Sequence, residues 1–97
     1  MAARKLASLG QGVDEAIRYE IDATPAPVTV TAVTVYDETE GEDVSGDVLQ
    51  GSAVIQEGRL VLPLLTNLVA RHVYRVEVQY SDGTNTLEPY FLVAGER

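Results

Sequence analysis

His72 is the only histidine in the chain, so any acid-base or nucleophilic chemistry is tested at that residue first. A Ser-His-Asp arrangement would have to pair it with one of the four serines, which are Ser8, Ser45, Ser52 and Ser81. None of these serines stands in the G-x-S-x-G pattern that exposes a nucleophile at a strand-to-helix turn. We therefore interpret His72 as a loop or surface histidine and predict no catalytic residue and no enzyme activity.

Acidic side chains gather in one short segment, DETEGEDVSGD at residues 37–47. Its carboxylates belong to Asp37, Glu38, Glu40, Glu42, Asp43 and Asp47. Calcium takes six to eight oxygen ligands, but the order of these residues does not match an EF-hand loop. The segment is interpreted as a solvated acidic turn, whether it binds a cation is left open, and no metal ion or cofactor is predicted.

Length and composition narrow the class of protein. The chain has 97 residues, 7 Lys+Arg against 15 Asp+Glu, a formal charge of -8 and no cysteine. It is long enough for one small domain, and without cysteine it has no disulfide, thiolate nucleophile or sulfur-ligated zinc. The basic residues are scattered, which argues against nucleic-acid binding. No apolar run is long enough to cross a membrane, and none follows Arg4 and Lys5, so we expect a soluble protein without a signal peptide.

From residue 16 onward, alternating apolar and polar residues predict short strands. The expected strands cover residues 16–22, 28–36, 52–55, 60–62, 73–80 and 86–93, with a bulge near Ala32 and a tight turn at Glu57 and Gly58. Pro63 indicates an edge position or the end of its strand, and Pro89 indicates an edge or a bulged position. About seven strands with frequent turns are typical of a two-sheet antiparallel β-sandwich.

The first fifteen residues lack this alternation, so the domain is expected to span residues 16–97. Residues 1–15 are expected to form an extended or partly helical N-terminal arm that is dispensable for folding. Leu6 and Leu9 would anchor that arm on a neighbouring protein.

Leu68 and Tyr74 have the spacing of a tyrosine corner at the start of the most regular strand. In such a corner the ring packs under a loop and its hydroxyl bonds a backbone group a few residues upstream. This pair is predicted to fix the crossover between the two sheets.

These segments resemble the small immunoglobulin-like or fibronectin-III-like structural proteins of tailed phages. The resemblance is carried by DEAIRYEID at residues 14–22, LTNL at 65–68 ahead of Tyr74, and YSDG at 80–83 ahead of YFLV at 90–93. Those proteins often have glycine where this chain has Arg71. The resemblance implies an all-β, immunoglobulin-like antiparallel β-sandwich and a non-enzymatic role.

It further implies a virion structural protein, assembled in the host cytoplasm, that acts as a neck or head-tail connector accessory or as a fibre-tail adaptor. Its partners would be other virion proteins (portal, connector, tail or fibre), and its copies would form a homo-oligomeric ring. In the last strand Tyr90 and Leu92 lie on the face opposite Leu87, Phe91 and Val93. Burial against a neighbouring subunit would explain large apolar groups on both faces and makes Tyr90 and Leu92 interface candidates; coverage by the chain's own N-terminal arm is the alternative. The alternatives are a capsid decoration protein and a cellular carbohydrate-binding or adhesion β-sandwich module; copy number, partner and position in the virion are left open.

Overall fold

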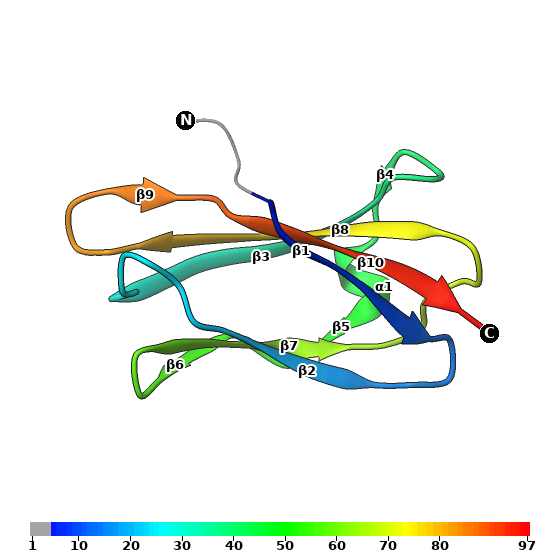
Figure 1. The fold of residues 1–97 in the computed structure, drawn as a ribbon, viewed down its shortest axis with the longest axis horizontal. Helices are drawn as coiled ribbons and strands as arrows, with labels where there is room; N and C mark the ends of the chain where they lie inside the picture. Colours follow the sequence, from blue (N-terminus) through cyan, green and yellow to red (C-terminus); the bar gives the residue numbers. More distant parts are fainter. Residues whose placement is uncertain (1–4) are drawn as a thin grey trace.

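The computed structural model describes residues 5–97, and side chains from residue 7 onward. This part of the chain folds into strands joined by turns, with one short helical turn (Figure 1). The elements are β1 (Lys5–Gly12), β2 (Ile17–Ile21), β3 (Thr29–Asp37), β4 (Glu42–Asp43), α1 (Ser45–Val48), β5 (Leu49–Gln50), β6 (Val54–Gln56), β7 (Arg59–Leu65), β8 (Val73–Ser81), β9 (Thr86–Leu87) and β10 (Tyr90–Glu96).

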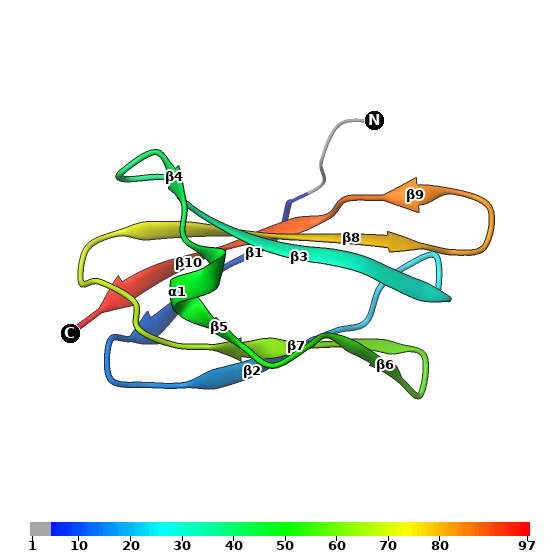
Figure 2. The same ribbon diagram turned by 180° about the vertical axis from the view of Figure 1, so that it is seen from behind.

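The strands form two sheets that lie one above the other (Figure 1). The larger sheet has the order β1-β10-β8-β3-β4, with β9 paired to β8, and the smaller has the order β2-β7-β5, with β6 paired to β7. The helical turn α1 lies between β4 of the larger sheet and β5 of the smaller one, so the chain changes sheets there (Figure 2). The expectation of an all-β fold with two sheets is confirmed.

The bulge in β3 and the turn between β6 and β7 lie where the sequence predicts them. The register of β3 on β8 shifts between Val30 and Ala32, which is the expected bulge, and it lets both Val30 and Val33 pack on the core. Gln56 pairs with Arg59 across the two-residue turn at Glu57 and Gly58, and both turn residues have positive φ, at 52° and 78°. This turn geometry matches the right-handed twist of the flanking strands.

Pro63 lies inside β7, the central strand of the smaller sheet, although it was expected at an edge or a strand end. The ladder is interrupted beside it on both sides. β2 shifts register between Arg18 and Glu20, while β5 pairs up to Gln50 and β6 begins again at Val54. A residue without an amide hydrogen is tolerated there because no ladder bond is required of it.

The first segment requires a correction. Residues 5–12 are extended but do not form a separate arm, because they make strand β1, which pairs in parallel with β10. The sequence hides this strand because LASLGQG has small residues and two glycines in place of β-branched alternation. No helix forms in the described part of this segment, residues 5–15.

The core lies between the sheets and is built from the inward positions of both. Its fully buried side chains include Tyr74, Tyr80, Leu60, Leu62, Leu65, Val35, Val76, Val78 and Val93. The expected last strand, residues 86–93, is divided at Pro89 into β9 and β10, and the Pro89 carbonyl accepts a hydrogen bond from the Val78 amide at 3.0 Å. Tyr74 and Tyr80 are the largest of these fully buried side chains.

Candidate functional site

His72 lies in a corner at one end of the sandwich, where it contacts the acidic turn. Its Nδ1 lies 2.8 Å from Oδ2 of Asp37, and its Nε2 lies 3.8 Å from a carboxylate oxygen of Glu40. The His72 side chain is about a fifth exposed, at 19%, whereas that of Asp37 is 5% exposed. His72 is therefore a paired, half-buried residue and not a plain surface histidine.

Asp37 was expected in a solvated turn, but it is buried at the end of β3. Besides His72, its carboxylate accepts hydrogen bonds from the amides of Thr39 at 2.9 Å and Glu40 at 3.1 Å. Burial raises the pKa of Asp37, but the bonds from His72, Glu40 and Thr39 outweigh burial and hold that pKa below its ordinary value. The Asp37 carboxylate thus holds the backbone of the turn in place. It points inward because residues 33, 35 and 37 alternate with outward-facing residues along β3.

The Asp37–His72 pair resembles the acid and the base of a catalytic triad, so the question is whether a serine lies within hydrogen-bonding distance of His72. Ser45 is the serine nearest in sequence to Asp37, and its hydroxyl bonds the Asp43 carboxylate at 2.7 Å and the Val35 carbonyl at 3.4 Å. Within residues 7–97, His72 has no hydrogen bond to a serine. The hydrogen bond between Asp37 and His72 links the end of β3 to the residue that precedes β8.

The other acidic residues of this turn have different partners: Glu38 lies 3.8 Å from a guanidinium nitrogen of Arg75, and Asp43 binds Ser45. The Asp43 carboxylate accepts bonds from the Ser45 amide and hydroxyl, and these bonds lower the pKa of Asp43. Among the described residues no group of three or more His, Cys, Asp or Glu side chains is placed to hold a metal ion.

The predicted corner residues Leu68 and Tyr74 are both buried, at 4% and 1% exposure. The Tyr74 hydroxyl accepts a hydrogen bond from the Val69 amide at 2.7 Å, which is the upstream backbone bond of a tyrosine corner. In the same loop Arg71 has a positive φ of 71°, and its amide bonds the Gly95 carbonyl at 2.9 Å. The left-handed backbone explains why glycine would suit the position that Arg71 occupies.

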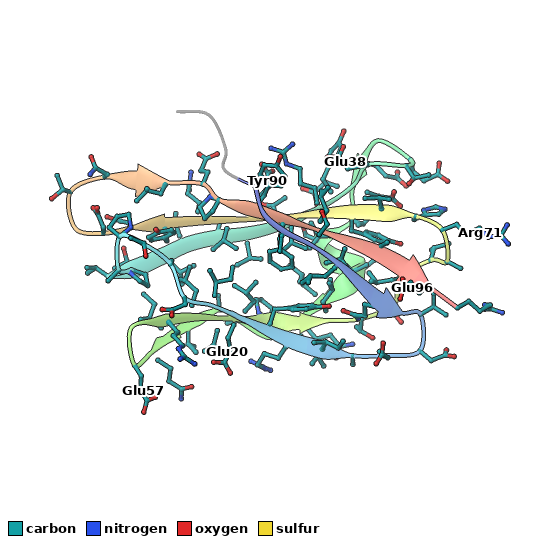
Figure 3. The ribbon with its side chains drawn as sticks, in the orientation of Figure 1. Glu20, Glu38, Glu57, Arg71, Tyr90 and Glu96 are labelled. Carbon is teal, nitrogen blue, oxygen red and sulfur yellow. The ribbon has the colours of Figure 1, made fainter. Side chains whose placement is uncertain are left out.

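Tyr90 and Leu92 lie half-buried on the outer face of the larger sheet, away from the core. Leu92 pairs across the strands with Arg75, and Arg75 pairs with Tyr36, so the three side chains form one row over β10, β8 and β3. The Arg75 guanidinium carbon lies 4.0 Å from the centre of the Tyr90 ring, a cation-π contact. We call Tyr36, Arg75, Tyr90 and Leu92 the outer-face cluster (Tyr90 is labelled in Figure 3).

The other predicted interface residues lie elsewhere. The Leu6 side chain is outside the described residues. Leu9 is 40% exposed and faces the groove between β1 and β2, where it lies with Tyr19 and Phe91. The structure therefore brings Tyr90 and Leu92 together but places Leu9 on a different surface.

Gln11 is the residue that sequence reasoning missed. It is fully buried on β1, and its Nε2 donates to the carbonyls of Leu65 at 2.8 Å and Glu15 at 3.1 Å. Its Oε1 accepts from the Tyr19 hydroxyl at 2.8 Å. Leu65 and Tyr19 belong to the smaller sheet, so Gln11 ties β1 across the sandwich. No local pattern marks a glutamine between two glycines as buried.

Comparison with known proteins finds no family model and no curated protein that matches the chain. Within residues 5–97, no helix has the length and apolar character needed to cross a membrane.

Proposed function

We propose that this chain is a non-enzymatic structural protein of a tailed-phage virion, a neck or head-tail connector accessory or a fibre-tail adaptor, that acts by protein-protein assembly. The observation that carries the assembly role is the outer-face cluster. Tyrosine and arginine are enriched at the energetically important centres of protein interfaces. Here they stand on a rigid sheet backed by the core, so a partner would meet a preformed surface with little ordering cost.

The immunoglobulin-like assignment is supported by the strand order. In that fold two sheets with the orders ABED and CFG face each other, with connections that cross between them. We match β2-β7-β5 to the BED part of the first sheet and β3-β8-β10 to the second, while β1 pairs with β10. The corner tyrosine, Tyr74, then stands near the start of the strand that corresponds to F, where the fold places it.

The phage assignment rests on the resemblance of the segments at residues 14–22, 65–74 and 80–93. A fold alone is a weak guide to function, since sandwiches of this kind serve many roles. The cellular carbohydrate-binding alternative is less well supported, because sugar rings stack on free aromatic faces and Arg75 already covers one face of Tyr90. A ring of copies, with symmetry inherited from a portal or capsid, remains part of the proposal.

The test uses complementation of a phage that lacks the gene for this chain. We expect immunoblots to detect the wild-type protein in purified particles. Leu92→Asp should fold with a urea midpoint near wild type but be absent from particles, since it places a charge in the outer-face cluster. The matched control is Val54→Asp, at a side chain of β6 that is 46% exposed on the other sheet, and it should be retained.

Two results would contradict the proposal in different ways. A wild-type chain missing from purified particles would refute the virion role. A Leu92→Asp protein that is incorporated normally would leave the chain a virion protein but would remove the outer-face cluster as its interface.

A further inference from the structure

One side of the sandwich is open between the edge strands β1 and β2, and it holds an apolar groove with a volume of about 250 Å³. Its apolar lining includes Leu9 of β1 and Ile21 of β2. The rings of Tyr19 and Phe91, whose centres lie 5.3 Å apart at an angle of 58°, also line it. This groove faces away from the outer-face cluster, so it is a separate surface.

One edge of β1, the edge that lies along this groove, is not paired with another described strand. The amide of Val13, directly after β1, donates to the Glu96 carbonyl at 2.7 Å. The register with β10 is continuous from Ser8 to Gly12, so in this part of β1 the main chain at odd-numbered positions is directed toward β10. In a strand the intervening residues direct their amides and carbonyls the other way. The Gly12 amide accordingly faces outward, where it donates to the Glu15 carboxylate at 2.6 Å.

Ser8 and Gly10 share the direction of Gly12. Within residues 5–97, β10 is the only strand that pairs with β1, so these two residues present their main-chain groups to the free edge. The Glu15 carboxylate closes the edge at Gly12 and thereby marks where an added strand would have to end. An exposed edge of this kind is a template for an extended segment from another chain.

The charge around the groove identifies the occupant. Glu20 of β2 and Asp22, which directly follows β2, also line the groove (Glu20 is labelled in Figure 3). Glu20 has only a loose ion pair with Arg59, at 3.7 Å with both side chains more than half exposed, and Asp22 has no ion pair among the described residues. On the other side of β1, the Glu96 carboxylate lies where a side chain at Gly10 would begin. The edge is thus acidic on both sides.

We propose that β1 binds an extended segment of a partner protein as an added strand, and that this segment carries lysine or arginine at positions facing the groove. The aliphatic stems of these residues would pack on Leu9 and Ile21, while their charged ends reach Glu20 and Asp22. A second copy of this chain fits less well, because each copy carries a formal charge of -8. This surface and its partner chemistry are independent of the proposed virion role.

The experiment uses the full chain, labelled with nitrogen-15, and two capped peptides as probes. TKTLTKT places two lysines and a leucine on one face of a strand, and TETLTET replaces the lysines with glutamates. We expect TKTLTKT to shift the amide signals of Ser8, Leu9 and Gly10, with an affinity that falls as salt rises. TETLTET at the same concentration should produce changes in amide chemical shift that are at least tenfold smaller.

Charge reversal provides the decisive variant. Glu20→Lys combined with Asp22→Lys should bind TETLTET in preference to TKTLTKT, whereas the control pair Glu42→Lys with Glu57→Lys changes the net charge equally and should keep the wild-type preference. The melting temperature of each variant confirms that it is folded.

Three results would overturn the proposal. Equal binding of both peptides by the wild-type chain would show that the groove does not select charge. Shifts confined to the outer-face cluster would place peptide binding on the other surface. Concentration-dependent self-association that shifts Ser8 and Gly10 without any peptide would make the occupant a second copy.

Discussion

Replacing Gln11 with alanine should destabilise the domain severely, although the residue lies on a strand that the sequence did not reveal. The substitution removes three hydrogen bonds, to the carbonyls of Leu65 and Glu15 and from the hydroxyl of Tyr19. Each such bond contributes about 1 kcal/mol net, and groups left buried without a partner cost about 1 to 3 kcal/mol. We therefore expect a loss of about 3 kcal/mol from a total that is about 5 to 15 kcal/mol for small domains.

Urea unfolding followed by tyrosine fluorescence measures this loss. With a slope of about 1 to 3 kcal/mol per molar urea, the midpoint should fall by about 1 to 3 M. Gln56→Ala is the matched control, since that glutamine is exposed on β6, and its midpoint should stay within error of wild type. A double-mutant cycle with Tyr19→Phe should give a coupling of about 1 kcal/mol, because the two side chains share one hydrogen bond.

Two results would contradict this role of Gln11: a loss of less than about 1 kcal/mol for Gln11→Ala, or an unchanged urea midpoint after deletion of residues 1–12. Either result would mean that β1 adds nothing to the stability of the sandwich, and residues 1–15 would again be an arm that is dispensable for folding.

Three further predictions concern the corner and the acidic turn. Tyr74→Phe should lower the free energy of unfolding by about 1 to 2 kcal/mol, because the Val69 amide loses its acceptor, whereas Tyr36→Phe, whose hydroxyl bond is exposed, should cost little in the same urea assay. Arg71→Gly should raise the free energy of unfolding by about 1 kcal/mol, because glycine adopts a positive φ without strain. Arg71→Ala keeps a Cβ and should not raise it, so equal melting temperatures for the two variants would refute this explanation. The folded-state pKa of Asp37 is depressed below 3.8, so its contribution to the free energy of unfolding is full above that pH and is lost as the pH falls through the folded-state pKa. Asp37→Asn should therefore flatten the acid side of a plot of unfolding free energy against pH. An unchanged acid side would contradict the stabilising role of this carboxylate.

The strands with regular alternation were predictable because each buries one face. Val73–Ser81 is the clearest case, with alternate residues buried along its whole length. The bulge near Ala32 was also predictable, since a shift of one residue in the apolar parity requires an extra residue on one strand. Gly58 identified its turn because two-residue hairpins require positive φ.

Features that depend on distant partners could not be predicted in this way. β1 is held by its parallel ladder with β10 and by Gln11, and neither leaves a local pattern in the sequence. The burial of Asp37 depends on His72, which is 35 residues away in the chain. Tyr90 and Leu92 were recognisable as an outer face from alternation alone, but the stacking of Arg75 on Tyr90 required the register between β8 and β10.

The parallel pairing of the first and last strands also determines how the molecule responds to pulling. Because β1 and β10 run in the same direction, the Lys5 end of one and the Glu96 end of the other lie at opposite ends of the pair. Tension applied at these two points slides the strands past each other, and it loads the whole ladder at once instead of opening it one bond at a time. Gln11, bonded across to the other sheet, resists the same sliding. Separating β1 from β10 under such a load therefore requires their ladder to break as a unit.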